Sequence, residues 1–182
     1  VHPDATILAS KAFSSNALTD VHILKNVTFG AEPFSGTTIR RVTFEEGITT
    51  IPADLLADTA LTTVTIPTTV TRIEAGAFKN NQLTNITLPD SITHIEAGSF
   101  DNNQLTSMSL PNSLTYIGES AFSNNKLTSI VFPNTITHIG GRAFSSNELT
   151  RVTIPPLVTT IASQAFERNK LTHVEMYDNV EI

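Results

Sequence analysis

The 182-residue chain has no cysteine and no tryptophan, and its lysines and arginines are few and scattered. Without cysteine it can form neither a disulfide framework nor a thiolate metal site, and it has no cysteine nucleophile. The formal net charge is -6, whereas a surface for nucleic acid or an anionic membrane normally carries a basic patch. We therefore expect no nucleic-acid partner.

Long apolar runs are also missing. No run approaches the roughly 20 residues of a transmembrane helix, so we expect no direct membrane insertion. The residues after Val1 show no basic and then apolar leader, although a leader already removed would leave the same sequence.

What the sequence does contain is a repeat with a period of 22 residues. Complete units start at residues 18, 39, 61, 83, 105, 127 and 149, and partial units cover 1–17 and 171–182. One apolar column consists of Phe78, Phe100, Phe122, Phe144 and Phe166. The early units depart from the pattern, since Glu45 stands in the proline column and Leu56 in the Phe column.

One unit, residues 83–104, shows what each repeat builds. Leu83–Leu88 ends in apolar and polar alternation, which predicts a strand with one face on a core, and Pro89 ends it because proline has no N–H to give. Ile92–Ile95 predicts a second short extended or irregular segment on the opposite side of the coil. Glu96–Phe100 predicts a helical or 3₁₀ turn that places its Phe in the core. Such a unit cannot bury its apolar face alone, so we expect the units to stack.

From Leu61 to Lys170 the units follow L-T-x-[IVM]-x-[ILF]-P-x-x-[IVL]-T-x-I-x-x-x-[AS]-F-x-x-N-x. This pattern resembles the BspA-like class of bacterial leucine-rich repeats, and with the degenerate units it covers nearly the whole chain. The resemblance implies an α/β solenoid, a right-handed coil with parallel β-strands on the concave side and short strands or 3₁₀/helical turns on the convex side. We expect residues 1–182 to form a single leucine-rich repeat domain that is a fragment of a larger protein.

The resemblance also implies a function. It suggests a non-catalytic protein-binding or adhesion module of a bacterial protein that is secreted or displayed on the cell surface, with no cofactor. The partner would be a host or bacterial surface protein, or a glycan; the sequence leaves the ligand and the oligomeric state open. Two alternatives remain: a structural spacer, or a flat array of threonines that binds ice or polysaccharide, built on columns such as Thr71, Thr93 and Thr115.

A polar column recurs in the pentapeptide NNQLT and its variants. We interpret its second Asn as a structural, buried amide that bonds free backbone groups of a tight turn and stacks on the same residue of the next unit. The column consists of Asn81, Asn103, Asn125, Asn147 and Asn169.

Candidate ligand-binding residues are the strand positions that point away from the core on the expected concave face. Binding energy tends to concentrate on Trp, Tyr and Arg, and here only Arg41 and Arg151 qualify, amid small polar residues. The candidates are Asp20, His22, Arg41, Thr63, Thr65, Asn85, Thr87, Arg151, His173 and Glu175.

Catalysis and metal binding have little support. His94 and His138 share a column, but Tyr116 lies between them, so about 10 Å separates them, too far for one metal. Glu74 and Glu96 are neighbours in another column, like the paired acids of a glycosidase, but on an expected convex surface without a pocket. We expect no enzyme and no metal site.

The C-terminal end begins a coil that it does not complete. Leu171, Val174, Met176 and Val180 follow the apolar pattern, but the chain stops at Ile182 before the next Phe. A solenoid cut in this way exposes its core, so we expect that the natural protein continues or that another molecule covers this end.

Overall fold

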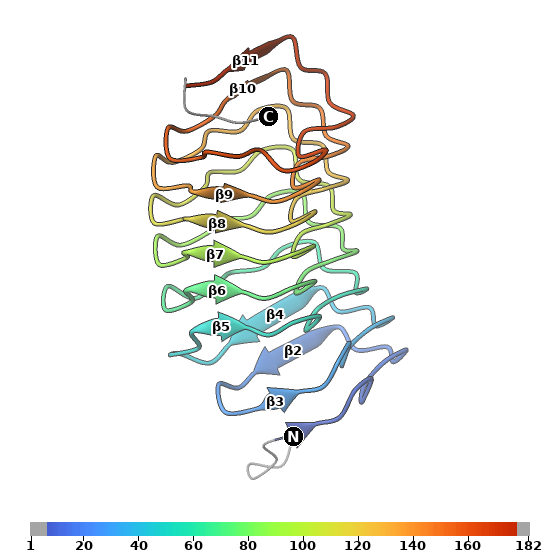
Figure 1. Cartoon of the computed structure of the whole chain (residues 1–182). Coiled ribbons are helices and arrows are strands. Elements are labelled where there is room, and N and C mark those ends of the chain that lie inside the picture. The colour runs from blue at the N-terminus through green and yellow to red at the C-terminus, as the bar shows by residue number, and fades with distance from the viewer. Residues whose placement is uncertain (1–6, 178–182) are drawn as a thin grey trace.

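The computed structural model describes residues 7–177, which form a rod of stacked coils (Figure 1). Strand β1 (Ile7–Leu8) lies at one end of the rod and β11 (His173–Glu175) at the other. Strands in successive units pair in parallel, for example Arg72 with His94, 22 residues further on. The period of the sequence is therefore the period of the coils, and the fold is a parallel-strand β-solenoid.

One side of the rod carries a continuous sheet of five short strands, which we call the five-stranded face. The extended segment predicted for Ile92–Ile95 is confirmed, because its last two residues form one of these strands. Each strand turns its second residue, an isoleucine, into the core, where it is fully buried. The strands are β5 (Thr50–Ile51), β6 (Arg72–Ile73), β7 (His94–Ile95), β8 (Tyr116–Ile117) and β9 (His138–Ile139).

Among residues 7–177, the other long side is a sheet only near its two ends, and we call it the split-sheet face. β2 (Asp20–Ile23) pairs with β4 (Arg41–Phe44), and β10 (Arg151–Thr153) pairs with β11. Within residues 7–177, no strand is assigned to the four segments between them, 63–66, 85–88, 107–110 and 129–132. A further pair, β1 with β3 (Thr28–Phe29), lies at the N-terminal end of the five-stranded side.

The strand predicted for Leu83–Leu88 is therefore wrong as a hydrogen-bonded strand, although its alternation is right. Ile86 and Leu88 are buried, whereas Asn85 and Thr87 are exposed. The physical reason is the proline that ends each middle segment, because it removes an N–H that the parallel ladder needs.

The two pairs on the split-sheet face support this explanation. Among residues 7–177, pairing occurs there only where the later of two successive units lacks the proline. Glu45 occupies the proline position after β4, and its N–H donates to the carbonyl of Ile23 at 2.8 Å. Tyr177 occupies the same position after β11.

The turn predicted as helical or 3₁₀ at Glu96–Phe100 is a second correction. The described residues 7–177 contain no helix, so the α/β class is not confirmed. Gly98 has φ of 63° and Asn102 has φ of 55°, which a right-handed helix does not accept. The N–H of Phe100 instead bonds the carbonyl of Ala121 in the next coil, at 2.8 Å. The backbone of this turn thus joins coils rather than closing a helix.

The core runs the length of the rod around a stack of phenylalanine rings. Phe78, Phe100, Phe122 and Phe144 are fully buried, with successive ring centroids 5.3–5.4 Å apart. Phe166 continues the stack at 5.7 Å but is only half-buried, because it lies near the C-terminal end.

Candidate functional site

The asparagine column lies inside the turns that join the coils. The Asn103 side-chain oxygen accepts the N–H of Leu83 at 3.1 Å, and its NH₂ donates to the carbonyls of Phe78 at 2.9 Å and Phe100 at 3.2 Å. Asn81, Asn125 and Asn147 are buried in the same arrangement, and Asn169 is half-buried in it. These amides are used by the backbone of two adjacent coils, which leaves them little capacity for a ligand.

All ten candidate ligand-binding residues are exposed on the split-sheet face. At its N-terminal end, Arg41 Nε lies 2.6 Å from Asp20 Oδ1, and His22 Nδ1 lies 2.9 Å from the Thr43 hydroxyl. The hydroxyl of Thr19, followed by Arg41, lowers the pKa of the Asp20 carboxyl below its ordinary value. Asp20 is therefore ionised at neutral pH.

Two crevices open on this face where the sheet hydrogen bonds are missing. The larger, with a cavity volume of about 480 Å³, lies between β4 and residues 63–67. Its polar lining includes the candidates Arg41, Thr63 and Thr65, and Val64 forms part of its apolar floor.

The second crevice, of about 310 Å³, lies between residues 85–88 and 107–109. It contains the candidates Asn85 and Thr87, with the half-buried Met108 in its floor. The crevices thus gather five of the ten candidates, whereas the others lie on the paired strands at the two ends of the face.

The threonine columns proposed as a flat lattice use their hydroxyl protons within the fold. Thr71, Thr93 and Thr115 each donate to the backbone carbonyl of the unit before, at 3.1–3.3 Å. In the neighbouring column, Thr69 donates to Ile48 at 2.5 Å, and Ser91, Ser113 and Thr135 donate in the same way. These hydroxyls can only accept hydrogen bonds from a ligand, which weakens the case for an ice or polysaccharide lattice.

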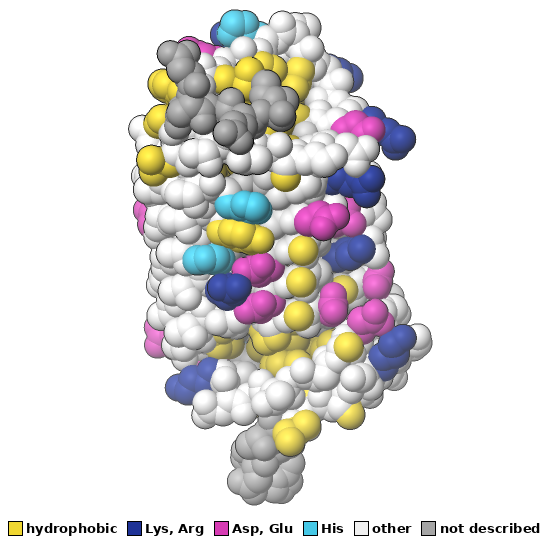
Figure 2. All heavy atoms as spheres, in the orientation of Figure 1, with side chains coloured by type: hydrophobic (Ala, Val, Ile, Leu, Met, Phe, Trp, Pro, Cys, Tyr) yellow, Lys and Arg dark blue, Asp and Glu magenta, His cyan; other side chains and the backbone are white. Residues whose placement is uncertain are grey.

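A row of stacked rings lies on the five-stranded face. The sequence analysis did not predict it as a surface feature. His94 and Tyr116 have ring centroids 5.7 Å apart, and Tyr116 and His138 have centroids 4.6 Å apart with planes 5° from parallel. Figure 2 shows this row of histidine and hydrophobic side chains beside a pair of acidic ones. The shared position of the three residues in the repeat was the available signal, but it was read only for metal ligation.

The acidic pair beside the rings is held by an arginine. Arg72 contacts Glu74 at 3.1 Å through Nε and Glu96 at 2.5 Å through Nη2. One guanidinium thus bridges carboxylates of two adjacent coils. Among residues 7–177, no group of three or more His, Cys, Asp or Glu is placed to hold a metal ion, and no helix is long and apolar enough to cross a membrane.

Comparison with known proteins gives a family and a fold. The pattern of the family described as "BspA type Leucine rich repeat region" matches residues 6–125 and 71–182, with six copies. A search of curated proteins finds no match.

Three solved structures are similar to this chain. A leucine-rich repeat protein from Bacteroides ovatus is 18% identical with a TM-score of 0.68, and the pneumococcal vaccine antigen PcpA is 19% identical with a TM-score of 0.64. A leucine-rich repeat protein from Eubacterium ventriosum is 22% identical with a TM-score of 0.59. The alignments cover 97%, 95% and 99% of this chain, which spans 65%, 54% and 60% of the length of those proteins. At these identities the likeness shows the fold.

Proposed function

The chain belongs to the BspA-type leucine-rich repeat family, and from this we propose that it is a protein-binding module of a bacterial secreted or cell-surface protein. Its role is recognition by surface side chains, without chemistry of its own. The pneumococcal antigen among its structural neighbours agrees with a location outside the cell.

The crevices of the split-sheet face are the observation that carries this proposal. Each combines a small apolar floor, Val64 in one and Met108 in the other, with a polar rim. The rim consists of threonine hydroxyls and Arg41 in the first crevice, and of hydroxyls and the Asn85 amide in the second. Arg41 stands at the edge of the first crevice, and the exposed Val131 lies further along the same face. An apolar centre with a polar rim is the usual composition of a protein interface. We infer that a partner polypeptide seats side chains in these crevices.

The spacer alternative predicts that no ligand exists, and the threonine-lattice alternative predicts ice or glycan binding. Both are tested by exposing the labelled chain to an array of matrix proteins, bacterial surface proteins and glycans, with thermal hysteresis measured separately. Capture of a protein and no glycan retention is the result expected here. If the array captures no protein, the binding proposal is wrong and the spacer alternative is favoured.

A captured protein then allows the face to be tested. Replacing both Arg41 and Arg151 with alanine should weaken capture by about tenfold or more, since an arginine that matters at an interface contributes on the order of 1 kcal/mol or more. The matched control is the double change His94→Ala and His138→Ala on the five-stranded face, which should leave capture unchanged. Loss of capture in the control variant alone would place the binding surface on the five-stranded face, at the stacked rings of His94, Tyr116 and His138.

A further inference from the structure

The five-stranded side of the rod has an internal break between β3 and β5, which lie in successive coils. Among the described residues, β3 pairs with β1 alone and β5 pairs with β6 alone. In that part of the chain no backbone hydrogen bond joins residues 24–30 to residues 46–53. Figure 1 shows β3 set apart from the evenly spaced strands β5–β9. Both coils that flank the break belong to residues 18–60, which the structure describes throughout.

Pro52 accounts for the missing pairing. After β6, the N–H of Glu74 donates to the carbonyl of Ile51 in the coil before, at 3.0 Å, and the same bond recurs after each of the next three strands. Pro52 occupies this position after β5 and has no N–H to give to the carbonyl of Phe29. The break therefore has the same physical cause as the missing strands of the split-sheet face.

The peptide groups of Phe29 and Thr50 are directed at each other across the break. In a parallel sheet, the N–H and C=O of one residue are directed to one neighbouring strand, and those of the next residue to the other. The N–H of Gly30 donates to the Leu8 carbonyl at 2.7 Å, and the Ile51 carbonyl accepts its bond from the coil after β5. Phe29 and Thr50, the adjacent residues, are thus directed the other way. Their N–H and C=O groups have no partner among residues 7–177.

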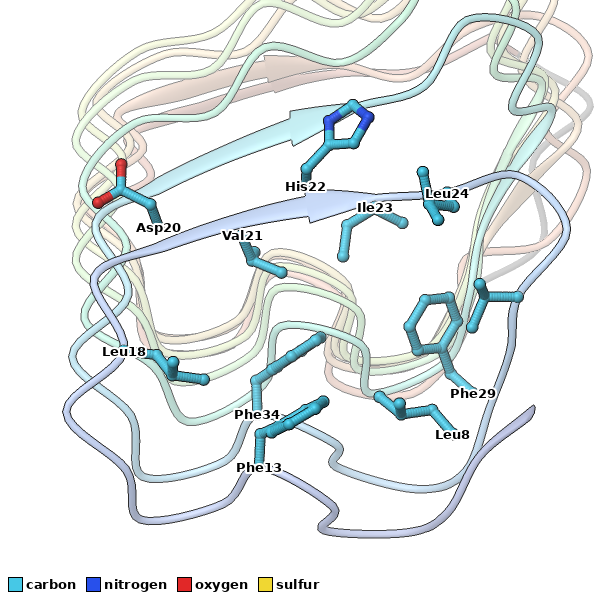
Figure 3. A pocket seen from close by; sticks show the side chains of 11 residues that line it. Leu8, Phe13, Leu18, Asp20, Val21, His22, Ile23, Leu24, Phe29 and Phe34 are labelled. Atoms are coloured by element: carbon cyan, nitrogen blue, oxygen red, sulfur yellow. The ribbon is translucent and has the colours of Figure 1, made fainter. Parts of the chain in front are cut away.

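A crevice with a cavity volume of about 320 Å³ lies at this break, and we call it the β3–β5 crevice. Residues of the segments 23–29 and 47–52 line it. The buried Ile23 and Ile48 and the half-buried Val27 give it an apolar floor. The ring of Phe29 points into the interior of the coil beneath β2 (Figure 3), so it leaves the space between the strands open. The volume is at the lower end of the roughly 300–1,000 Å³ of ligand pockets, which suits a short segment.

Contacts on both sides of the β3–β5 crevice keep the two coils together. On one side, the Glu45 carboxylate accepts the N–H of Lys25 at 2.9 Å and lies 3.4 Å from its ammonium group. On the other, the N–H of Gly36 donates to the Asp58 carbonyl at 2.7 Å. The crevice is therefore a local opening in one wall of a joined rod.

We propose that the β3–β5 crevice binds an extended segment of a partner polypeptide, which enters the sheet as an additional strand. Its N–H and C=O groups bond the free groups of Phe29 on one side and of Thr50 on the other. A polypeptide strand fits this chemistry because it offers both partial charges, N–H and C=O, alternately toward its two neighbours. Addition of a strand to an exposed sheet edge is an established mode of peptide recognition.

The lining of the crevice also defines the side chains of the bound segment. Alternate side chains of a strand point to opposite faces, so one set faces Val27 and Ile48 and the other faces water. The segment should therefore alternate apolar and polar residues and lack proline at its bonded positions. This site uses main-chain bonds and lies apart from the crevices of the split-sheet face, so it does not depend on the function proposed for them.

Selection of the full 182-residue chain against a library of displayed random peptides supplies a defined probe. Methylation of a central backbone nitrogen removes one N–H of a selected peptide and keeps its side chains, and it should weaken binding by about tenfold. Hydrogen exchange at the N–H groups of Phe29 and Thr50 should slow when the peptide binds. The proposal is wrong if no peptide is selected, or if methylation changes neither the affinity nor the exchange.

Two variants then locate the peptide. Pro52→Glu restores the N–H that Glu74 supplies one coil later, so β3 and β5 should pair and the affinity should fall by about tenfold or more. Closure itself is visible as slower exchange at Phe29 without peptide. Thr50→Pro acts without closure, because it removes an N–H that the sheet of β5 and β6 does not use. Its affinity for the peptide should fall in the same way.

The control is the double change Arg41→Ala and Arg151→Ala on the split-sheet face, which should leave peptide binding unchanged. Circular dichroism establishes that each variant is folded before titration. Folded Pro52→Glu and Thr50→Pro variants that bind the peptide as tightly as the unchanged chain would overturn the proposal. Loss of binding in the arginine variant alone would also overturn it, because the peptide would then occupy the split-sheet crevices.

Discussion

At the scale of single residues, the two adjacent asparagines of NNQLT have different structural roles. Asn102 has φ of 55° and is exposed, and its NH₂ donates to the Asn80 side chain at 2.9 Å. Asn tolerates this left-handed conformation better than most residues, which explains its use there. Asn103 is buried, and its amide satisfies backbone groups that the turn leaves unpaired. Leu105 then enters the core as the next unit begins.

Replacing Asn103 with alanine should therefore cost about 2–4 kcal/mol of folding stability. The change leaves the buried N–H of Leu83 without a partner, which costs about 1–3 kcal/mol before the structure relaxes. It also removes one of the two hydrogen bonds that the carbonyls of Phe78 and Phe100 accept, since Asn81 and Asn125 donate the others. Denaturant titration followed by circular dichroism measures the loss. Gln104→Ala, one residue further on and exposed, is the control and should change stability by less than about 0.5 kcal/mol. Similar losses for both variants would show that the buried amide has no special role.

At the scale of elements, the five-stranded face is held by the close approach of successive coils. Gly118 follows β8, and a Cβ placed on it would lie 2.5 Å from the Ala97 nitrogen and 2.7 Å from the Glu96 carbonyl carbon. These are backbone atoms, which cannot rotate away as a side chain can. The same column holds Glu74 and Glu96 in earlier units, so the coils are packed more tightly after β8 than before it.

Gly118→Ala should consequently destabilise the fold by about 1–3 kcal/mol, the usual cost of overpacking. The midpoint of urea unfolding should fall. The matched variant is Gly141→Ala, whose added Cβ would meet only the Ser163 carbonyl oxygen at 3.2 Å, so a smaller loss is expected. Equal midpoints for the two variants would mean that the coils separate there without cost.

At the scale of the whole molecule, stability depends on contacts between neighbouring coils along one axis. Phe122 stacks on Phe100 at 5.3 Å and on Phe144 at 5.4 Å and is fully buried. Phe166 is half-buried and belongs to the last described turn of the stack. The middle of the rod should therefore be the most stable part, and its ends should open first.

Two single substitutions, one in the middle of the rod and one near its C-terminal end, test this difference in stability. Phe122→Ala should cost about 3–5 kcal/mol, the usual cost for a buried phenylalanine, whereas Phe166→Ala should cost clearly less. Hydrogen exchange should show the second change confined to the C-terminal coils, while the first lowers protection on both sides of residue 122. Equal losses of folding stability for the two variants would indicate that the rod unfolds as a single cooperative unit.

Much of the fold could be predicted from the sequence because the same residue pattern recurs in successive repeat units. The family resemblance is confirmed by the matched family pattern, and the phenylalanine column lies in the core as expected. The second extended segment is confirmed as the strands of the five-stranded face. The ten candidate ligand-binding residues are exposed, but their role in binding stays a prediction.

The spacing of the repeat by itself determined the stacking and the residues that enter the core, because a side chain every 22 residues can be buried only by its own counterpart in the next coil. Tertiary structure alone decided which side carries the continuous sheet, since that depends on how closely backbones approach and on which N–H groups proline removes. It also decided that Tyr116 and its two histidines form a stacked row. These features arise from contacts between units, whereas the sequence pattern describes each unit singly.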